Sequence, residues 1–306
     1  MNHYLTELDL PTGATLRILA DAEKLKAERA AKKTRDCLHG RSVALYFEKP
    51  SVRTRVSFSV GIAELGGQVV ELSSSNTKVG KGEDPADFAT VLGRYVHAIV
   101  ARVFSQDVLH TLAKHGNVPV INALSDERHP CQALADAMTI RERKGKVADC
   151  VFAFVGEGNN VAASTGLLLA SLGAEVRVAS PDGYGLAAGV LYESRGLQGK
   201  LLQTDSVEEA VTGADVVYTD TWISMGQEQE GQARRETFRG YRIDARTMKW
   251  AKPDAIVMHC LPAVRGEEID AELMYSDSSA IWDQAENRLH VQKALLRALL
   301  GAPPLR

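Results

Sequence analysis

Short apolar runs alternate with longer stretches of mixed polarity along most of the chain. In the first half, each apolar run ends at polar residues or glycine. This is the pattern of strands that are buried on both faces of a parallel sheet. The strands predicted there are residues 43–47, 68–72, 97–102 and 118–122. Residues 56–65 and 83–95 lie between them and are predicted to be helices, so the alternation indicates a series of β–α–β units.

The alternation restarts in the second half, after a predicted helix at residues 134–144 that could bridge two domains. The strands predicted there are residues 151–155, 175–179, 216–219, 255–258 and 280–282, with helices such as 162–172 and 207–212 between them. A last helix, residues 286–300, places leucines on one face and ends before Gly301 and Pro303. We therefore predict an α/β protein with two doubly wound parallel-sheet domains and a cleft between them.

Composition narrows the possible classes of protein. The chain has 306 residues and a formal net charge of −3, which argues against a general nucleic-acid binder. Its four cysteines are too few for a disulfide scaffold and favour a reduced, cytoplasmic setting. Apolar runs stay short of the length that spans a bilayer, and residues 1–10 do not form the apolar core of a signal peptide.

Unusual polar clusters follow the predicted strands, at the sheet edge where open α/β folds bind ligands. Residues 51–55, Ser-Val-Arg-Thr-Arg, lie at a strand-to-helix turn. Free helix N–H groups, hydroxyls and guanidiniums together favour a phosphate or carboxylate site over a solvated helix cap. Residues 129–132, His-Pro-Cys-Gln, follow the strand at 118–122 and could either bind a carbonyl or amide group or simply cap a helix.

Three further clusters follow strands of the second half. Residues 156–161, Gly-Glu-Gly-Asn-Asn-Val, lack the third glycine of a dinucleotide-binding loop and fit a small polar ligand or a plain turn. Residues 220–227 begin with Asp220, whose carboxylate could hold an ammonium group. At 259–263, Cys260 could be a nucleophile, a metal ligand or a hydrogen-bonding partner. No closed ligand spacing supports zinc.

In this order, the clusters resemble the motifs of an ornithine carbamoyltransferase. The matching motifs are Ser-x-Arg-Thr-Arg at 51–55, His-Pro-Cys-Gln at 129–132, Asp-x-x-x-Ser-Met-Gly at 220–226 and His-Cys-Leu-Pro at 259–262. The resemblance spans essentially the whole chain. It implies transfer of the carbamoyl group of carbamoyl phosphate to the δ-amino group of ornithine, which gives citrulline and phosphate. It also implies a carbamoyl phosphate domain at 1–146, with residues 286–306 packing back on it, and an ornithine domain at 147–285.

The resemblance also implies roles for individual residues. Catalysis is expected to depend on Cys260, Arg102 and His129. The residues expected to bind carbamoyl phosphate are Ser51, Val52, Arg53, Thr54, Lys78, Arg102, His129, Gln132, Cys260, Leu261 and Arg288. Those expected to bind ornithine are Asn160, Asp220, Ser224 and Met225. Either Asp220 or Cys260 could take the proton that the amine must lose.

The family uses no metal and no organic cofactor, and it implies a homotrimer or a multiple of trimers, with arginine biosynthesis as the usual pathway. The chain departs from the common family pattern at Val52, Lys78 and Val264. Three other interpretations make different predictions: a carbamoyltransferase for another amine such as putrescine, a nucleotide-dependent oxidoreductase built on residues 156–160, and a relative that only binds an anion or a partner.

Overall fold

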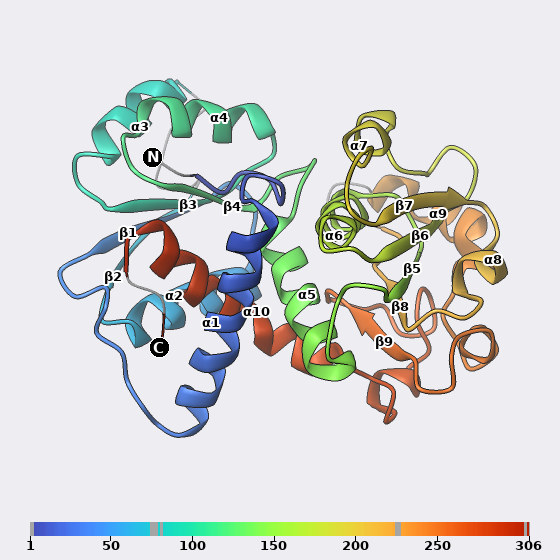
Figure 1. Ribbon diagram of the computed structural model, residues 1–306. Coiled ribbons are helices and arrows are strands. Elements are labelled where there is room, and N and C mark those ends of the chain that lie inside the picture. Colours follow the sequence, from blue (N-terminus) through green and yellow to red (C-terminus); the bar gives the residue numbers. More distant parts are fainter. Residues whose placement is uncertain (1–2, 74–78, 80–81, 224–227, 303–304, 306) are drawn as a thin grey trace. The chain divides into compact units, whose positions relative to one another are not determined.

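The computed structural model describes residues 3–73, 79, 82–223, 228–302 and 305. The chain divides into two compact units, each with its own sheet (Figure 1). Unit 1 comprises Met1–Met138 and Asn287–Arg306, and unit 2 comprises Thr139–Glu286. Unit 2 is therefore one continuous segment, whereas unit 1 is assembled from the two ends of the chain.

The sheet of unit 1 is parallel throughout and has the strand order β2-β1-β3-β4. Its strands are β1 (Ser42–Phe47), β2 (Gln68–Ser73), β3 (Ala98–Arg102) and β4 (Val120–Leu124). Chain order reverses between β1 and β3, because β2 lies on one side of β1 and β3 lies on the other. The loops that follow β1 and β3 therefore lie at the switch point of the strand order, the position where open α/β sheets bind ligands.

Helices cover this sheet and connect it with the rest of the chain. They are α1 (Thr12–Ala30), α2 (Val52–Glu64), α3 (Pro85–Leu92) and α4 (Gln106–His115). Helix α5 (Pro130–Lys144) leads into unit 2, and α10 (Ile281–Leu299) returns to unit 1. Helices α1 and α10 lie side by side in Figure 1, where Lys26 Nζ of α1 donates to Asn287 Oδ1 at 2.8 Å.

The sheet of unit 2 is also parallel and has the order β7-β6-β5-β8-β9. Its strands are β5 (Val151–Val155), β6 (Glu175–Ala179), β7 (Lys200–Thr204), β8 (Val216–Thr219) and β9 (Ile256–His259). The helices of this unit are α6 (Asn160–Ser171), α7 (Ala188–Glu193), α8 (Val207–Val211) and α9 (Gly231–Phe238). Here chain order reverses between β5 and β8, which places the loops after these strands next to each other.

The predicted fold class, two doubly wound parallel-sheet units, is confirmed. One predicted strand is wrong: residues 280–282 lie at the start of α10, because Ile281 and Trp282 form its first turn. Helix α2 begins at Val52 rather than at residue 56, and β4 begins two residues later than predicted. Helices α1 and α4 and strand β7 were not predicted. The predicted cleft and the assignment of a substrate to each domain stay predictions.

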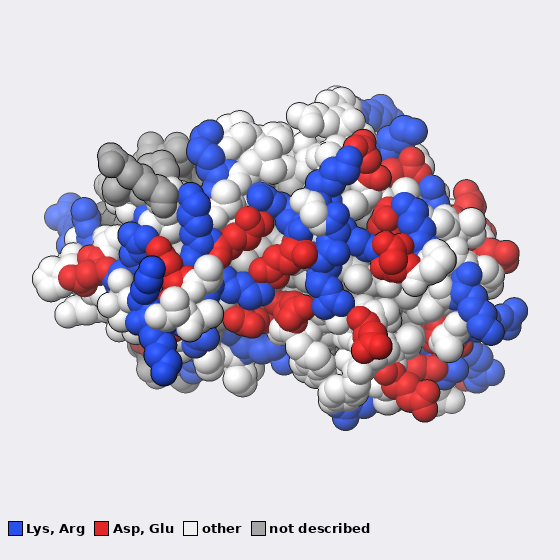
Figure 2. Space-filling model, turned by 60° about the horizontal axis from the view of Figure 1, so that its bottom comes forward, with Lys and Arg blue, Asp and Glu red and all other residues white. Residues whose placement is uncertain are grey.

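Each sheet has a dry apolar core. Tyr46, Phe88 and Ile99 are buried together in unit 1, and Val155, Val217 and Ile243 are buried together in unit 2. On the face drawn in Figure 2, basic and acidic side chains are intermixed, in keeping with the small net charge. Among the helices that the structure describes, none is both long enough and apolar enough to cross a bilayer.

Candidate active site

The first turn of α2 forms the start of a polar site in unit 1. Ser51 precedes it in an extended conformation (φ −159°, ψ 106°), and its side chain does not cap the helix. The first N–H groups of a helix have no intrahelical acceptor, and they carry the positive end of the helix dipole. Val52 is 78% exposed, whereas the Thr54 side chain is buried. This turn follows β1 at the sheet edge, and its N–H groups and hydroxyls are arranged as in helix N-termini that bind anions.

Guanidinium groups gather beside this turn. Arg288 Nη2 on α10 donates to Thr54 Oγ1 at 2.6 Å. Arg102 ends β3 and is 8% exposed. Burial, together with the positive charges of Arg288 and Arg53, lowers the pKa of Arg102 to about 10. We call Arg53, Thr54, Arg102 and Arg288 the cationic cluster. Its like charges oppose one another, and a bound dianion would relieve that repulsion.

The two arginines of the 51–55 motif have different surroundings. The charge of Arg53 acts on Arg102, as expected of a member of the cationic cluster. Arg55 instead places its guanidinium over the Phe47 ring, 5.3 Å from the ring centre, and lies 3.7 Å from Glu71. The motif alone had suggested both guanidiniums as donors to an anion. In the structure Arg55 instead contacts Phe47 and lies near Glu71, so only Arg53 belongs to the cationic cluster.

His129 and Gln132 stand at the start of α5. His129 is 4% exposed. Burial first, and then the charges of Arg288 and Arg102, hold the pKa of His129 well below 6.5, so its imidazole is neutral at neutral pH. Gln132 Nε2 donates to Asp136 Oδ1 at 2.8 Å. Gln132 Oε1 is buried and lacks a hydrogen-bond partner among the described residues, so it can accept a bond from a ligand N–H.

A second polar site lies at the sheet edge of unit 2. Asp220 follows β8 and is 8% exposed. Its Oδ1 accepts hydrogen bonds from Cys260 Sγ at 2.9 Å and from the Thr221 backbone N–H at 2.8 Å. Its Oδ2 accepts from Asn159 Nδ2 at 2.8 Å. We call Asn159, Asp220, His259 and Cys260 the thiol cluster. Cys260 is thus a hydrogen-bonding partner of a carboxylate, one of the three roles that the sequence left open.

Asn159 was not predicted to belong to the site. Its Oδ1 accepts from the N–H groups of Val161 and Ala162, both at 3.0 Å, and so caps α6, while its Nδ2 holds Asp220. In a dinucleotide-binding loop, the helix N–H groups would contact the pyrophosphate instead. Gly158 lies so close to another loop that an added Cβ would be 2.3 Å from the Leu186 nitrogen. The loop is therefore built for capping and close packing, which removes support from the oxidoreductase interpretation.

His259 holds the turn that carries Cys260. Its Nδ1 accepts from the Leu261 N–H at 2.8 Å, so its proton lies on Nε2, which is 3.1 Å from Oε1 of the buried Glu268. Leu261 has a φ of 60°, a conformation that L-residues adopt only when their surroundings hold them there. Possible ligand atoms of Asp220, His259 and Cys260 lie within 4.8 Å of one another. Both His259 nitrogens nevertheless have protein partners, so this imidazole serves as a support.

Arg234 on α9 is a second residue that sequence reasoning missed. It is 3% exposed, and its Nε donates to the Trp222 carbonyl at 2.6 Å. Its Nη2 contacts Glu157 in the loop after β5, and its guanidinium lies 5.1 Å from the centre of the Tyr184 ring. One buried cation thus holds the loops that follow three strands. These partners are far apart in sequence, so no local pattern could have indicated the role.

The predicted site residues therefore fall into two sets. Unit 1 brings together Ser51, Val52, Arg53, Thr54, Arg102, His129, Gln132 and Arg288. Unit 2 brings together Asp220, Cys260 and Leu261, with Asn160 at the start of α6. Lys78, Ser224 and Met225 lie outside the described residues.

One parallel α/β unit carries a cationic cluster at a helix N-terminus, and the other carries a thiol bonded to a carboxylate. A group-transfer enzyme with an anionic leaving group needs features of both kinds. Residues 2–142 match the family model for the aspartate/ornithine carbamoyltransferase, carbamoyl-P binding domain. Residues 148–299 match the model for the Asp/Orn binding domain of the same family. The chain belongs to the aspartate/ornithine carbamoyltransferase family.

Individual members of the family are similar to this chain over nearly its full length. An ornithine carbamoyltransferase of Parafrankia sp. (strain EAN1pec) is 50% identical over 303 residues, which cover 97% of this chain and 96% of the relative. That of Acidothermus cellulolyticus is 50% identical over 306 residues, covering 99% of this chain and 97% of the relative. The solved ornithine carbamoyltransferase from Pyrococcus furiosus superposes with a TM-score of 0.96 at 44% identity, covering 99% of this chain and 98% of that one.

Proposed function

We propose that this chain is an enzyme that transfers the carbamoyl group of carbamoyl phosphate to the δ-amino group of L-ornithine. The amine nitrogen attacks the carbonyl carbon, the bond from that carbon to the bridging phosphate oxygen breaks, and the amine loses a proton. Citrulline and phosphate are the products. The family membership and the names of the relatives support the reaction, and the two clusters support the chemistry.

In unit 1, the proposed ligand is carbamoyl phosphate. The phosphate contacts Ser51, the Val52 N–H, Arg53 and Thr54, and the guanidiniums of Arg102 and Arg288 neutralise its growing charge. The observation that carries this assignment is the bond from Arg288 Nη2 to Thr54 Oγ1 in the first turn of α2. The buried Arg102 agrees with it, since burial first, and then the charges of Arg288 and Arg53, lower its pKa. Positive charge that is concentrated in this way favours the binding of a dianion.

His129 and Gln132 are assigned to the carbamoyl group. Because its pKa is lowered, His129 is a neutral imidazole, so it donates a hydrogen bond to the carbonyl oxygen without losing its proton. Gln132 Oε1, for which the described part of the chain offers no hydrogen-bond partner, accepts from the carbamoyl N–H₂. These bonds orient the carbonyl carbon for attack and strengthen as negative charge develops on its oxygen.

In unit 2, the proposed ligand is ornithine. The Asp220 carboxylate attracts the δ-ammonium group, which must lose a proton before it can attack. We assign proton uptake to the Asp220–Cys260 pair, because the thiol already shares Oδ1 of that carboxylate. Asn160, Ser224 and Met225 bind the amino-acid end of ornithine. Leu261, in the turn that His259 holds, is assigned together with Cys260 and Lys78 to carbamoyl phosphate.

A steady-state assay tests the substrate. Carbamoyl phosphate is paired in turn with ornithine, putrescine, aspartate and acetylornithine, and the carbamoylated product is measured. We expect citrulline to form with ornithine far faster than any other product forms. Turnover of another amine while ornithine fails would overturn the substrate assignment. Anion binding without any carbamoylated product would instead favour a non-catalytic relative, and tight binding of a nicotinamide cofactor would favour the oxidoreductase.

The proposal requires one enzyme to bind both substrates at the same time. A bisubstrate analogue that joins the phosphate-bearing group to ornithine should bind far more tightly than either substrate alone, because the second contact becomes intramolecular. Affinity no better than that of carbamoyl phosphate would contradict simultaneous binding of the two substrates. Arg53→Ala and Cys260→Ser should each weaken binding of the analogue.

We also propose that the enzyme is a cytoplasmic homotrimer, or a multiple of trimers, that serves arginine biosynthesis. The family resemblance supports this, and so does the exposure of the apolar Val52, Val56 and Phe104 at the edge of unit 1. Light scattering of the purified chain should give a multiple of three times 33.2 kDa. A stable monomer with full activity would contradict the trimer.

A further inference from the structure

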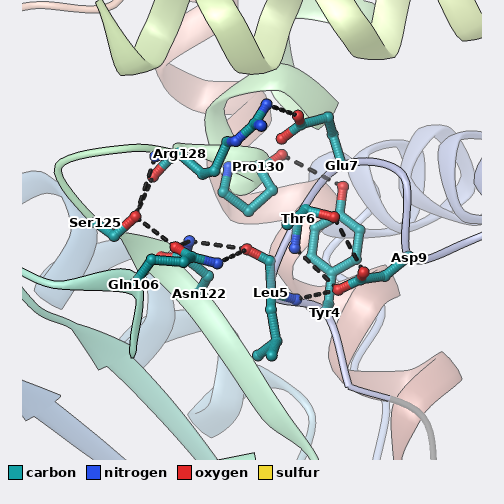
Figure 3. A network of polar contacts seen from close by, with 10 residues as sticks. All are labelled: Tyr4, Leu5, Thr6, Glu7, Asp9, Gln106, Asn122, Ser125, Arg128 and Pro130. Atoms are coloured by element: carbon teal, nitrogen blue, oxygen red, sulfur yellow. Dashed lines mark hydrogen bonds and ion pairs between the residues drawn. The ribbon is translucent and has the colours of Figure 1, made fainter. Parts of the chain in front are cut away.

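The segment before α1 is built into the sheet of unit 1. The Tyr4 N–H donates to the Val120 carbonyl, and the Asn122 N–H donates to the Tyr4 carbonyl, both at 2.8 Å. Tyr4 thereby pairs in parallel with Ile121 of the edge strand β4. Tyr4 therefore lies along the edge of β4, the strand whose end leads to His129 (Figure 3).

Buried polar side chains connect this segment with the loop that follows β4. The Leu5 carbonyl accepts from Asn122 Nδ2 at 2.9 Å and from Gln106 Nε2 at 3.2 Å. Gln106 Oε1 in turn accepts from Ser125 Oγ at 2.6 Å. All three of these side chains are buried, so their bonds are not exchanged with water (Figure 3).

Ser125 and Arg128 close the loop upon itself. The Ser125 N–H donates to the Arg128 carbonyl at 2.8 Å, and the Arg128 N–H donates to Ser125 Oγ at 3.0 Å. The next residue is His129, and beyond it Cys131 Sγ contacts the Asn122 carbonyl at 3.3 Å. The residue before His129 is thus bonded to Ser125, and Cys131, two residues after it, is bonded to β4.

An ion pair completes the attachment. Arg128 Nη1 donates to Glu7 Oε1 at 2.9 Å, and the two side chains are 9% and 0% exposed (Figure 3). A buried ion pair stabilises a fold little more than an apolar pair of the same volume, but each charge strongly requires the other. The pair therefore fixes where Arg128 lies, and with it the backbone that enters His129.

We propose that Glu7 is a positioning residue for carbamoyl transfer, which acts through Arg128 to hold the loop at 125–128 and so to aim His129 at the carbamoyl carbonyl. This inference rests on the role proposed above for His129. Misplacing a group that contacts the reacting carbonyl by about 1 Å can lower the rate by up to about a hundredfold. The expected defect is confined to carbamoyl phosphate, because ornithine binding is assigned to unit 2.

A double-mutant cycle tests the inference. Glu7→Gln, Arg128→Met and the double variant are compared with the unaltered chain by citrulline formation and thermal unfolding. We expect Glu7→Gln to lower kcat/KM for carbamoyl phosphate about tenfold and to leave KM for ornithine within about twofold. In the Arg128→Met background, Glu7→Gln should add less than about a further twofold, since its effect passes through Arg128.

Controls separate positioning from a general loss of stability. Lys293→Met removes another buried cation of unit 1, which pairs with Glu64 at 2.6 Å, and should lower the melting temperature without a selective defect for carbamoyl phosphate. Arg128→Lys keeps the positive charge that pairs with Glu7 and should retain most of the activity. If Glu7→Gln does not fold, the comparison of Arg128→Lys with Arg128→Met tests the inference instead.

Two outcomes would overturn the inference: folded Glu7→Gln with normal kcat/KM for carbamoyl phosphate, or an equal loss in the Arg128→Met background. An equal selective defect in Lys293→Met would also overturn it. Failure of the unaltered chain to make citrulline would instead refute the proposed function, so the two failures are distinguishable.

Discussion

The two polar clusters differ in how their charges are satisfied. In unit 1, burial first, and then the positive charges of Arg288 and Arg53, lower the pKa of Arg102. In unit 2, the Asp220 carboxylate accepts bonds from Cys260, Asn159 and a backbone N–H. The positive charges of the cationic cluster therefore repel one another, and a bound anion would reduce that repulsion. In the thiol cluster, by contrast, the Asp220 carboxylate already accepts hydrogen bonds from the protein.

This difference predicts different responses to mutation. Removing a charge from the cationic cluster should weaken ligand binding without a large loss of stability, since it also removes repulsion. Removing a member of the network around the thiol cluster should leave a buried partner unsatisfied and therefore lower stability as well.

The largest effect is expected at Arg234, which supports the loops around the thiol cluster. Arg234→Met should lower the free energy of unfolding by about 3 kcal/mol or more, because it leaves the Glu157 carboxylate in the protein without its cation. Chemical denaturation measures this. The adjacent Arg235→Met is the matched control: its ion pair with Glu267 is half exposed, so its loss should cost less than about 1 kcal/mol. Equal losses would show that the network does not depend on Arg234.

The next effect concerns the cationic cluster. Arg53→Ala should lower kcat/KM for carbamoyl phosphate by roughly thirtyfold, or about 2 kcal/mol in transition-state binding, through loss of a charge-assisted contact. Its thermal stability should stay close to that of the unaltered chain. Arg55→Ala changes the same residue type in the same motif, but that guanidinium lies over Phe47 and should matter less. Near-normal kinetics of Arg53→Ala would contradict the anion site.

A pH dependence of stability is expected from His129. Its folded-state pKa is lowered by burial, so below the unfolded value of 6.5 the unfolded chain binds a proton that the folded chain does not. Stability should therefore fall as the pH drops through that value, with a contribution of at most about 1.4 kcal/mol per pH unit. His129→Gln should remove this part of the slope. If the free energy of unfolding of His129→Gln still changes with pH between 6.5 and 5 as it does in the unaltered chain, His129 is not the group responsible for that dependence.

The smallest effect is expected from the thiol itself. Cys260→Ser keeps a donor toward Asp220 but changes its length and acidity, so activity should fall by about tenfold, equivalent to about 1.4 kcal/mol. Cys37→Ser, which lies far from either cluster in the sequence, should behave like the unaltered chain. Citrulline formation is measured for both variants. Equal activities would show that Cys260 does not belong to the active site.

The sequence predicted those parts of the site that are local in the chain. Residues 51–55 carry their own donors and follow a predicted strand, so the residue pattern alone favoured an anion site there. For residues 129–132 the pattern left a helix cap equally open, and the family resemblance supplied the assignment. The strand order could not be predicted, yet it is the order that brings the loop after β5 beside Asp220. The alternating pattern gives the positions of strands but not which of them are neighbours.

Supporting residues were missed for a different reason. Arg234 pairs with a carboxylate 77 residues away, and Arg128 pairs with one 121 residues away. Either arginine alone looks like an ordinary surface cation. The strand predicted at 280–282 failed because an apolar run at the start of an amphipathic helix has the same composition as a short strand.

The bond between Thr54 and Arg288 joins residues that are 234 positions apart, with the whole of unit 2 between them. On the ribosome, Arg288 is therefore made only after every residue of unit 2, so the continuous unit 2 can fold while unit 1 still lacks its C-terminal segment, Asn287–Arg306. The nascent chain cannot complete its cationic cluster until translation has passed Arg288.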